Sequence, residues 1–282
     1  MNIKDALHEA SKILKKNEII SFKLDSEILM SKVFKRDRKF IILNVEKELK
    51  KDDLDEFNTL IKERSYGKPI SYILGKKDFW KYEFEVRRDV LIPRPDTEII
   101  VEETLKTLKN KSSLKILDIG IGSGCILLSI LKEKKKSYGV GIDISKKCLD
   151  LSEINALKHG VRNRVKFYKS DIDNFNYGKY DLIISNPPYI KHIDYKYLDK
   201  DIKRFEPKLA LDGGLDGLSE IRKVVKKSSK LIKTNGKLIL EIGFDQKKEV
   251  KKILNSKGFY INKIIKDYAK NNRCIISTKI NS

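Results

Sequence analysis

The stretch Leu117–Ile126, "LDIGIGSGCI", decides the fold of this 282-residue chain. It begins as an apolar strand, passes through alternating glycines and continues into an apolar helical segment. Glycines at a strand-to-helix turn let the backbone bend tightly and approach a ligand closely. The glycine pattern alone would also fit a flexible turn. The order of strand, glycines and helix instead favours a nucleotide-binding turn.

Apolar strands and helical segments alternate on the C-terminal side of this turn. The expected strands are residues 114–119, 138–142, 165–168, 181–185, 237–242, 259–265 and 274–279. The expected helices lie near residues 124–133, 146–159, 217–232 and 246–256. Such alternation is typical of a doubly wound, mostly parallel α/β sheet.

Acidic residues stand at the ends of the first three strands. Asp118 leads into the glycine turn, and Asp143 ends the second strand in "GVGIDIS". A carboxylate there suits the two hydroxyls of a ribose, whereas Ser145 is the better candidate for capping the next helix. Asp171 follows the third strand, where it can accept from an adenine amino group, with Ile172 against the adenine face. The pattern predicts a nucleoside site.

The spacing Asp-x-Gly-x-Gly-x-Gly differs from that of dinucleotide-binding folds. It resembles S-adenosylmethionine-dependent methyltransferases, in which Asp118 would lie near the methionine amino group. The resemblance implies a Rossmann-like class I methyltransferase domain with a mostly parallel seven-stranded sheet. It also implies S-adenosylmethionine as cofactor, S-adenosylhomocysteine as product and no metal. The expected cofactor-binding residues are Asp118, Gly120, Ile121, Gly122, Ser123, Gly124, Asp143, Asp171, Ile172 and Asn186.

The fourth strand delivers "SNPPY", Ser185–Tyr189, to the same edge of the sheet. Proline has no N–H, so the backbone carbonyls here can turn outward as acceptors. The side-chain oxygen of Asn186 and the carbonyl of Pro187 can hold both protons of an –NH2 group, on which Tyr189 can stack. We expect Asn186, Pro187 and Tyr189 to be catalytic, and Asn186, Pro187, Pro188 and Tyr189 to bind substrate. Adenine, guanine and glutamine all carry such a nitrogen.

The chain divides into three parts by composition. Residues 1–66 contain neither Gly nor Pro, and their apolar residues recur every three or four positions, which predicts a helical bundle domain over 1–69. Residues 70–92 are rich in aromatic and β-branched side chains, which predicts a β-hairpin linker. The α/β domain then covers 93–282.

Charge and cysteine content limit which partners and which cellular compartment the sequence fits. The net charge is +21, from 61 Lys and Arg against 40 Asp and Glu. This balance fits a nucleic-acid or ribonucleoprotein partner, and equally a chain with solvated lysine faces, because the lysines are spread out. The three cysteines form no CxxC pair, no apolar run can span a bilayer, and the N-terminus lacks an apolar signal region. We expect a cytoplasmic protein with no membrane partner.

Further motifs make the resemblance narrower. The chain carries "SNPPYI", "IPRPDTE" (Ile92–Glu98), "FEPKLALDGGLDGL" (Phe205–Leu218) and "LEIGFDQ" (Leu240–Gln246). Over nearly its whole length it resembles the N(5)-glutamine methyltransferases that modify peptide chain release factors. One departure is Lys270, where that family usually has Gly.

This resemblance implies a substrate, the glutamine of the Gly-Gly-Gln motif in class 1 release factors, and a role in modulating translation termination. The reaction would be a direct displacement at the methyl group, with no strong base needed before attack. The helical domain would dock the release factor or only cover the sheet edge. The enzyme would act as a monomer without nucleic acid.

The residues leave two questions open, the role of Arg94 and the class of substrate. Arg94 can contact the release factor or pair with an internal acid, and the loop at Phe205–Pro207 is expected to close over the site. The alternative function is a nucleic-acid methyltransferase acting on an adenine or guanine amino group. Such an enzyme would be expected to carry a target-recognition or RNA-binding domain, and none is visible in the sequence.

Overall fold

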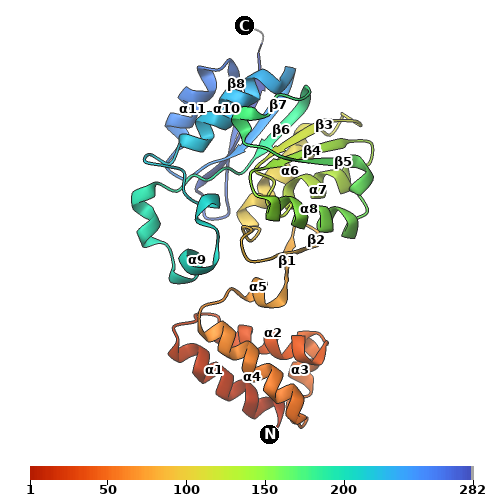
Figure 1. Cartoon of the computed structure of the whole chain (residues 1–282), viewed down its shortest axis with the longest axis vertical. Helices are drawn as coiled ribbons and strands as arrows, with labels where there is room; N and C mark the ends of the chain where they lie inside the picture. Colours follow the sequence, from red (N-terminus) through yellow and green to blue (C-terminus); the bar gives the residue numbers. More distant parts are fainter. Residues whose placement is uncertain (281–282) are drawn as a thin grey trace. The chain divides into compact units, whose positions relative to one another are not determined.

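A computed structural model describes residues 1–280 (Figure 1). The chain forms two compact units. The first comprises Met1–Lys76 and Asp199–Phe205, and the second comprises the remainder.

The first unit is helical. Its helices are α1 (Ile3–Lys16), α2 (Phe22–Phe34), α3 (Arg38–Leu43), α4 (Lys51–Ser65), α5 (Ile70–Leu74) and α9 (Lys200–Phe205). The apolar faces of α1, α2 and α4 meet in a core that buries Leu14, Leu29 and Phe57. The side chain of Asn2 caps α1 by accepting from the Asp5 backbone N–H at 2.9 Å, as expected at a helix start.

Residues 70–74 differ from the predicted hairpin, because they form the short helix α5. Pro69 fixes the backbone at the start of this helix. Gly75 ends it in the left-handed conformation, with φ of 78°. The proline and glycine outweigh the β propensity of Ile70–Leu74.

The second unit contains a small hairpin and a large sheet. The hairpin pairs β1 (Lys76–Phe79) with β2 (Tyr82–Glu85). The sheet has seven strands in the order β5-β4-β3-β6-β7-β9-β8, and only the pairings of β9 are antiparallel. The strands are β3 (Lys115–Ile119), β4 (Tyr138–Asp143), β5 (Val165–Lys169), β6 (Tyr180–Ser185), β7 (Ile232–Glu241), β8 (Phe259–Lys266) and β9 (Asn272–Lys279). This confirms the predicted α/β class with a mostly parallel sheet.

Helices cover both faces of the sheet. One face packs against α6 (Glu98–Thr107), α7 (Cys125–Glu133) and α8 (Lys146–Lys158), and the other packs against α10 (Ser219–Leu231) and α11 (Lys247–Asn255), as Figure 1 shows. Successive β6 residues alternate between the two cores: Leu182 and Ile184 enter one, and Ile183 enters the other. Short 3₁₀ helices occur at Pro95–Thr97, Arg162–Arg164, Ile172–Asn174, His192–Tyr197 and Lys208–Ala210.

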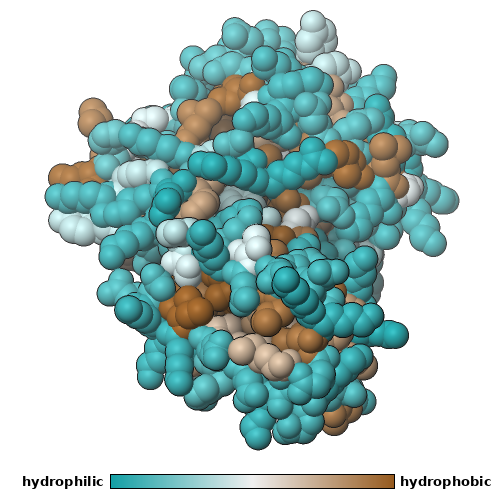
Figure 2. Space-filling view, turned by 60° about the horizontal axis from the view of Figure 1, so that its bottom comes forward, coloured by the Kyte–Doolittle hydropathy of each residue, from teal (hydrophilic) through white to brown (hydrophobic). Residues whose placement is uncertain are grey.

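The face of the molecule drawn in Figure 2 is mainly hydrophilic. Figure 2 shows hydrophilic side chains over most of the face in view, with smaller apolar patches between them. Among residues 1–280, no helix is both long and apolar enough to cross a bilayer.

Candidate active site

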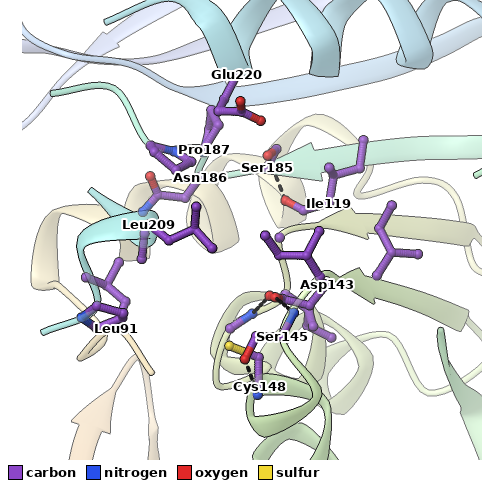
Figure 3. A pocket seen from close by; sticks show the side chains of 18 of the residues that line it. Leu91, Ile119, Asp143, Ser145, Cys148, Ser185, Asn186, Pro187, Leu209 and Glu220 are labelled. Atoms are coloured by element: carbon purple, nitrogen blue, oxygen red, sulfur yellow. Dashed lines mark hydrogen bonds between the residues drawn. The ribbon is translucent and has the colours of Figure 1, made fainter. Parts of the chain in front are cut away.

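A cavity of about 540 Å³ opens at the carboxyl ends of β3, β4 and β6. Its size falls within the range of roughly 300–1,000 Å³ typical of small-molecule sites. Figure 3 shows Asp143 and Ser145 across the cavity from Asn186 and Pro187. The predicted site residues in its wall are Gly120, Ile121, Gly122, Ser123, Asp143, Asp171, Ile172, Asn186, Pro187 and Pro188.

The glycine turn after β3 forms one wall of the cavity. Gly120, Gly122 and Gly124 have φ values of 75°, 57° and 82°, a region that side-chain-bearing residues rarely adopt. The backbone N–H groups of Gly120 and Ile121 donate to the carbonyl of Ile142 at 2.9 and 3.0 Å. These bonds fix the turn against the end of β4. Gly124 lies behind the wall, where it precedes α7.

Asp118 lies behind the same turn and does not line the cavity. Its side chain is fully buried, and neither oxygen has a hydrogen-bond partner in the described part of the chain. Burial raises the pKa of the Asp118 carboxyl to about 8, which the nearby Leu127 N–H opposes only in part. A buried acid without a partner is costly, so this carboxyl is suited to meet a cationic group.

Asp143 ends β4 with its carboxylate held by two backbone N–H groups. Gly122 donates to one oxygen at 3.1 Å, and Ser145 donates to the other at 2.9 Å. Burial raises the pKa of the Asp143 carboxyl, although both bonds oppose the shift. Each oxygen keeps a lone pair for further donors such as hydroxyls. As predicted, Ser145 caps α8 by accepting from the Cys148 N–H.

Asn186 and the two prolines follow β6. The end of this strand is fixed by Ser185, whose hydroxyl donates to the carbonyl of Ile119 at 2.7 Å (Figure 3). The side-chain amide of Asn186 donates through Nδ2 to Oγ1 of Thr97 at 3.2 Å. Thr97 also lines the cavity.

Tyr189 lies outside the cavity wall. Its hydroxyl donates to Glu241 Oε1 at 3.2 Å and accepts from Arg273 Nη1 at 3.3 Å. Burial and the Glu241 carboxylate raise the pKa of this hydroxyl well above its usual range, with Arg273 opposing. The predicted stacking of Tyr189 on a substrate stays a prediction.

Glu241, at the end of β7, joins these groups into one buried network. It is 2% exposed and accepts from the Thr97 hydroxyl through Oε2 at 2.7 Å. Burial raises the pKa of the Glu241 carboxyl to about 7, while Thr97 and Arg273 lower it. Glu241 therefore links Thr97, behind Asn186, to Tyr189.

Gln246 fastens the loops around "SNPPY". Its Nε2 donates to the carbonyls of Tyr189 and Gly217, each at 2.9 Å, and its Oε1 accepts from the Gly243 N–H at 2.9 Å. A Cβ at Gly217 would lie 2.6 Å from the Tyr189 carbonyl oxygen, so only glycine allows this approach. Gly213 and Gly217 of "LDGGLDGL" thus pack directly on the "SNPPY" backbone.

At the cavity mouth, Arg94 pairs with an internal acid. Arg94 Nη2 lies 2.6 Å from Glu206 Oε1. Pro207, next in the chain, lines the cavity.

The sequence pattern located most of this wall but not the network behind it. Asp118, Gly124 and Tyr189 stand outside the wall. Thr97, Glu241 and Gln246 were not predicted to act in the site, although all three lie inside the motifs "IPRPDTE" and "LEIGFDQ". The available signal was that each is a polar residue inside a motif that the sequence had already singled out.

Comparison with known proteins identifies the family. A model of the PrmC N-terminal domain matches residues 5–75, and one of the methyltransferase small domain matches residues 102–263. The release factor glutamine methyltransferase of Clostridium botulinum is 39% identical over 282 residues, 99% of this chain and 100% of that protein. The chain belongs to the release factor glutamine methyltransferase family. A Buchnera aphidicola member of the family is 38% identical, with 99% of this chain and 100% of that protein covered.

Solved structures support the fold of the second unit. The ribosomal protein L11 methylase of Lactobacillus delbrueckii superposes with a TM-score of 0.52 at 16% identity, covering 73% of this chain and 90% of that one. A Pyrococcus furiosus methyltransferase also gives 0.52 at 16% identity, covering 70% and 89%. The sheet and its helices therefore form a class I methyltransferase fold.

As a member of this family, the chain is a methyltransferase that uses S-adenosylmethionine. The cavity residues fit this cofactor. Asp143, in the wall, has lone pairs for ribose hydroxyls, and the unpartnered Asp118, behind the glycine turn, suits an ammonium group. Ile121 and Ile172 supply apolar surface for a flat base.

Proposed function

We propose that this release factor glutamine methyltransferase family member methylates the side-chain nitrogen of the glutamine in the Gly-Gly-Gln motif of class 1 release factors. The modification would modulate translation termination. Relatives that match 99% of the chain are named release factor glutamine methyltransferases, which supports the proposal. The observation that carries the proposal is the carboxamide of Asn186, held at the cavity with its nitrogen bonded to Thr97.

In this proposal the "SNPPY" loop holds the substrate amide. The side-chain oxygen of Asn186 and the carbonyl of Pro187 accept from the two N–H groups of the glutamine, and Pro188 and Tyr189 complete the binding surface. S-adenosylmethionine supplies an electrophilic methyl group when bound. An amide nitrogen is a poor nucleophile because its lone pair is conjugated. Holding both protons positions the nitrogen in line, which is worth more here than a strong base.

The cofactor would be held by residues of the glycine turn and the neighbouring strand ends. Asp118 would meet the methionine amino group, Asp143 the ribose, and Asp171 with Ile172 the adenine. The remaining residues of the set are Gly120, Ile121, Gly122, Ser123, Gly124 and Asn186.

The remaining parts of the chain are assigned by the same proposal. The helical domain, residues 1–69, docks the release factor, and residues 70–92 link it to the methyltransferase domain at 93–282. The enzyme acts as a monomer in the cytoplasm without nucleic acid. The three cysteines are all free, which suits a reducing compartment.

A methyl-transfer assay tests the proposal. Labelled S-adenosylmethionine is mixed with a purified class 1 release factor, its Gln→Ala variant, total RNA or DNA. Label should enter only the intact release factor. Asn186→Ala should remove it, and the exposed control Asn110→Ala should not. Label in nucleic acid alone would replace the proposal with the nucleic-acid alternative, which the net charge of +21 makes the natural competitor.

A further inference from the structure

A buried chain of hydrogen bonds runs behind Asn186, from β7 to the cavity. Thr97 ends the 3₁₀ turn Pro95–Thr97 and, like Glu241, is only 2% exposed. The Thr97 hydroxyl lies 2.7 Å from Glu241 Oε2 and 3.2 Å from Asn186 Nδ2. One hydroxyl therefore joins a buried carboxyl to the side chain expected to hold the substrate.

We propose that Thr97 is a positioning residue that keeps the Asn186 carboxamide in the one orientation that presents its oxygen to the cavity. The hydrogen bonds from Glu241 through Thr97 to Asn186 are called the relay below, and Glu241 determines which group donates in each of them. The inference rests on the proposed function, because it concerns how Asn186 receives the substrate amide.

The direction of the relay follows from counting protons. Thr97 has a single hydroxyl proton, and when Glu241 is ionised this proton is donated to the Glu241 carboxylate, which can then only accept. What the hydroxyl offers to Asn186 is then a lone pair, and only the Nδ2 end of the carboxamide can donate to it. The Oδ1 end is consequently directed away from Thr97.

Glu241, at the far end of the relay from Asn186, is held in place by several neighbouring groups. Glu241 Oε1 also accepts from the Tyr189 hydroxyl, which in turn accepts from Arg273. Arg273 donates to a single oxygen of Asp267, Oδ2, through both Nε at 3.1 Å and Nη2 at 3.0 Å. The Thr97 backbone N–H donates to the Arg94 carbonyl at 3.1 Å. Neither end of the Thr97 bond pair can move freely.

The orientation matters because the two ends of a carboxamide are nearly the same size. A flipped Asn186 would fit the same space but would present –NH2 to a substrate that also presents –NH2. Two donors facing each other cannot bond, so the flipped form cannot hold the glutamine amide. Loss of the Thr97 hydroxyl should thus reduce turnover without disturbing the cofactor end of the cavity.

The test compares Thr97→Val, which keeps the shape and removes the hydroxyl, with Thr97→Ser, which keeps the hydroxyl. We expect Val to lower kcat for the release factor by about ten- to hundredfold, with the Kd for S-adenosylmethionine changed less than about threefold. Ser should restore kcat to within about threefold of wild type. Wild-type kcat in Thr97→Val would overturn the inference, as would an equal loss in both variants.

A second measurement uses the wild-type protein and no release factor. The side-chain NH2 signals of Asn186, assigned in a ¹⁵N spectrum by their absence from Asn186→Asp, should exchange with solvent more slowly than those of exposed Asn110. Exchange as fast as at Asn110 would overturn the inference even if Thr97→Val does not fold. Slow exchange in a wild-type enzyme that does not methylate release factor would support the relay while the proposed function fails.

Discussion

Two buried acids on one sheet have opposite surroundings. Asp118 on β3 and Glu241 on β7 are each 2% exposed or less, and both point to the face that packs on α6 and α7, judged from Ile116 and Ile239 two residues away. Asp118 has no hydrogen-bond partner in the described chain, whereas Glu241 accepts from two hydroxyls. The unpartnered acid is the one that the proposed function assigns to a ligand, whereas the partnered acid bonds to groups of the protein itself.

The difference divides the cavity into two functional halves. Residues around β3 and β4 have lone pairs and one unpartnered carboxyl, which the proposed function assigns to the cofactor. Residues around β6 and β7 instead bond their polar groups to one another, and this network reaches the cavity through the Asn186 carboxamide. Mutations in the two halves should therefore separate cofactor affinity from turnover.

The largest effect is expected from Asp118→Asn. Folding raises the pKa of Asp118 from 3.8 to about 8, so its contribution to stability is complete below pH 3.8 and is lost as pH rises through 8. The variant should raise the free energy of unfolding at pH 8.5 by on the order of 3–5 kcal/mol, with little gain near pH 4. It should also weaken S-adenosylmethionine binding by about ten- to hundredfold.

Urea unfolding followed by Trp80 fluorescence measures the stability, since the chain's single tryptophan lies in the second unit. Calorimetry measures the affinity. Asp181→Asn is the matched control, because Asp181 is paired with Lys233 and its pKa is lowered. It should have the opposite, smaller effect on stability. Unchanged cofactor affinity in Asp118→Asn would show that Asp118, like Glu241, has only a structural role, and the proposed difference between the two acids would be wrong.

Glu241→Gln tests the other half. The pKa of Glu241 is raised from 4.5 to about 7, so its contribution to stability is present below pH 4.5 and is lost as pH rises through 7. Glutamine keeps an acceptor for Thr97 but cannot ionise. Wild type should lose on the order of 2–3 kcal/mol relative to the variant between pH 5 and 8, and the Kd for S-adenosylmethionine should not change. If the free energies of unfolding of wild type and Glu241→Gln changed in parallel with pH, this expectation would be contradicted.

The sequence predicted more of the cavity wall than of the network behind it, for a physical reason. Strand ends, glycine turns and the acids beside them are encoded by consecutive residues, as in Leu117–Ile126. The network is encoded by residues far apart: Thr97 and Glu241 are separated by 144 positions, and Asn186 and Thr97 by 89. Spacing within a motif carries no information about such pairs.

A similar argument applies to two local predictions. Tyr189 was expected to face the substrate because it follows the prolines; groups on β7 and β9 bond its hydroxyl, and its contact with the substrate stays a prediction. Residues 70–74 were expected to be extended from their β-branched and aromatic content, but Pro69 and Gly75 enclose a helix. In that segment the flanking proline and glycine outweigh the residues' own β preference.

Gly217→Ala should act on the network half with a smaller effect. Gly217 has a φ of 75°, and a Cβ there would lie 2.6 Å from the Tyr189 carbonyl oxygen and 2.8 Å from Gln246 Nε2. The variant should lose about 2–3 kcal/mol of stability and part of its turnover, with cofactor affinity unchanged. Gly160→Ala is the control, since Gly160 has a φ of 66° and no atom within 4 Å of its added Cβ. It should lose only about 1 kcal/mol. Equal losses at the two positions would show that the backbone conformation, not the contact with "SNPPY", sets the cost.

The smallest effect is expected at the turn that carries Arg273 toward the network. Lys270 has a φ of 65°, and its N–H donates to the Asp267 carbonyl at 2.9 Å, so a side-chain-bearing residue occupies the left-handed position of a tight turn. Relief of this strain should let Lys270→Gly gain about 0.5–1 kcal/mol in the urea assay. Arg273 should stay bonded to Asp267 and Tyr189, so kcat and cofactor affinity should match wild type. A gain in stability together with a loss of kcat would mean that the strained turn itself aims Arg273 at Tyr189, and the network half would then extend to the β8–β9 hairpin.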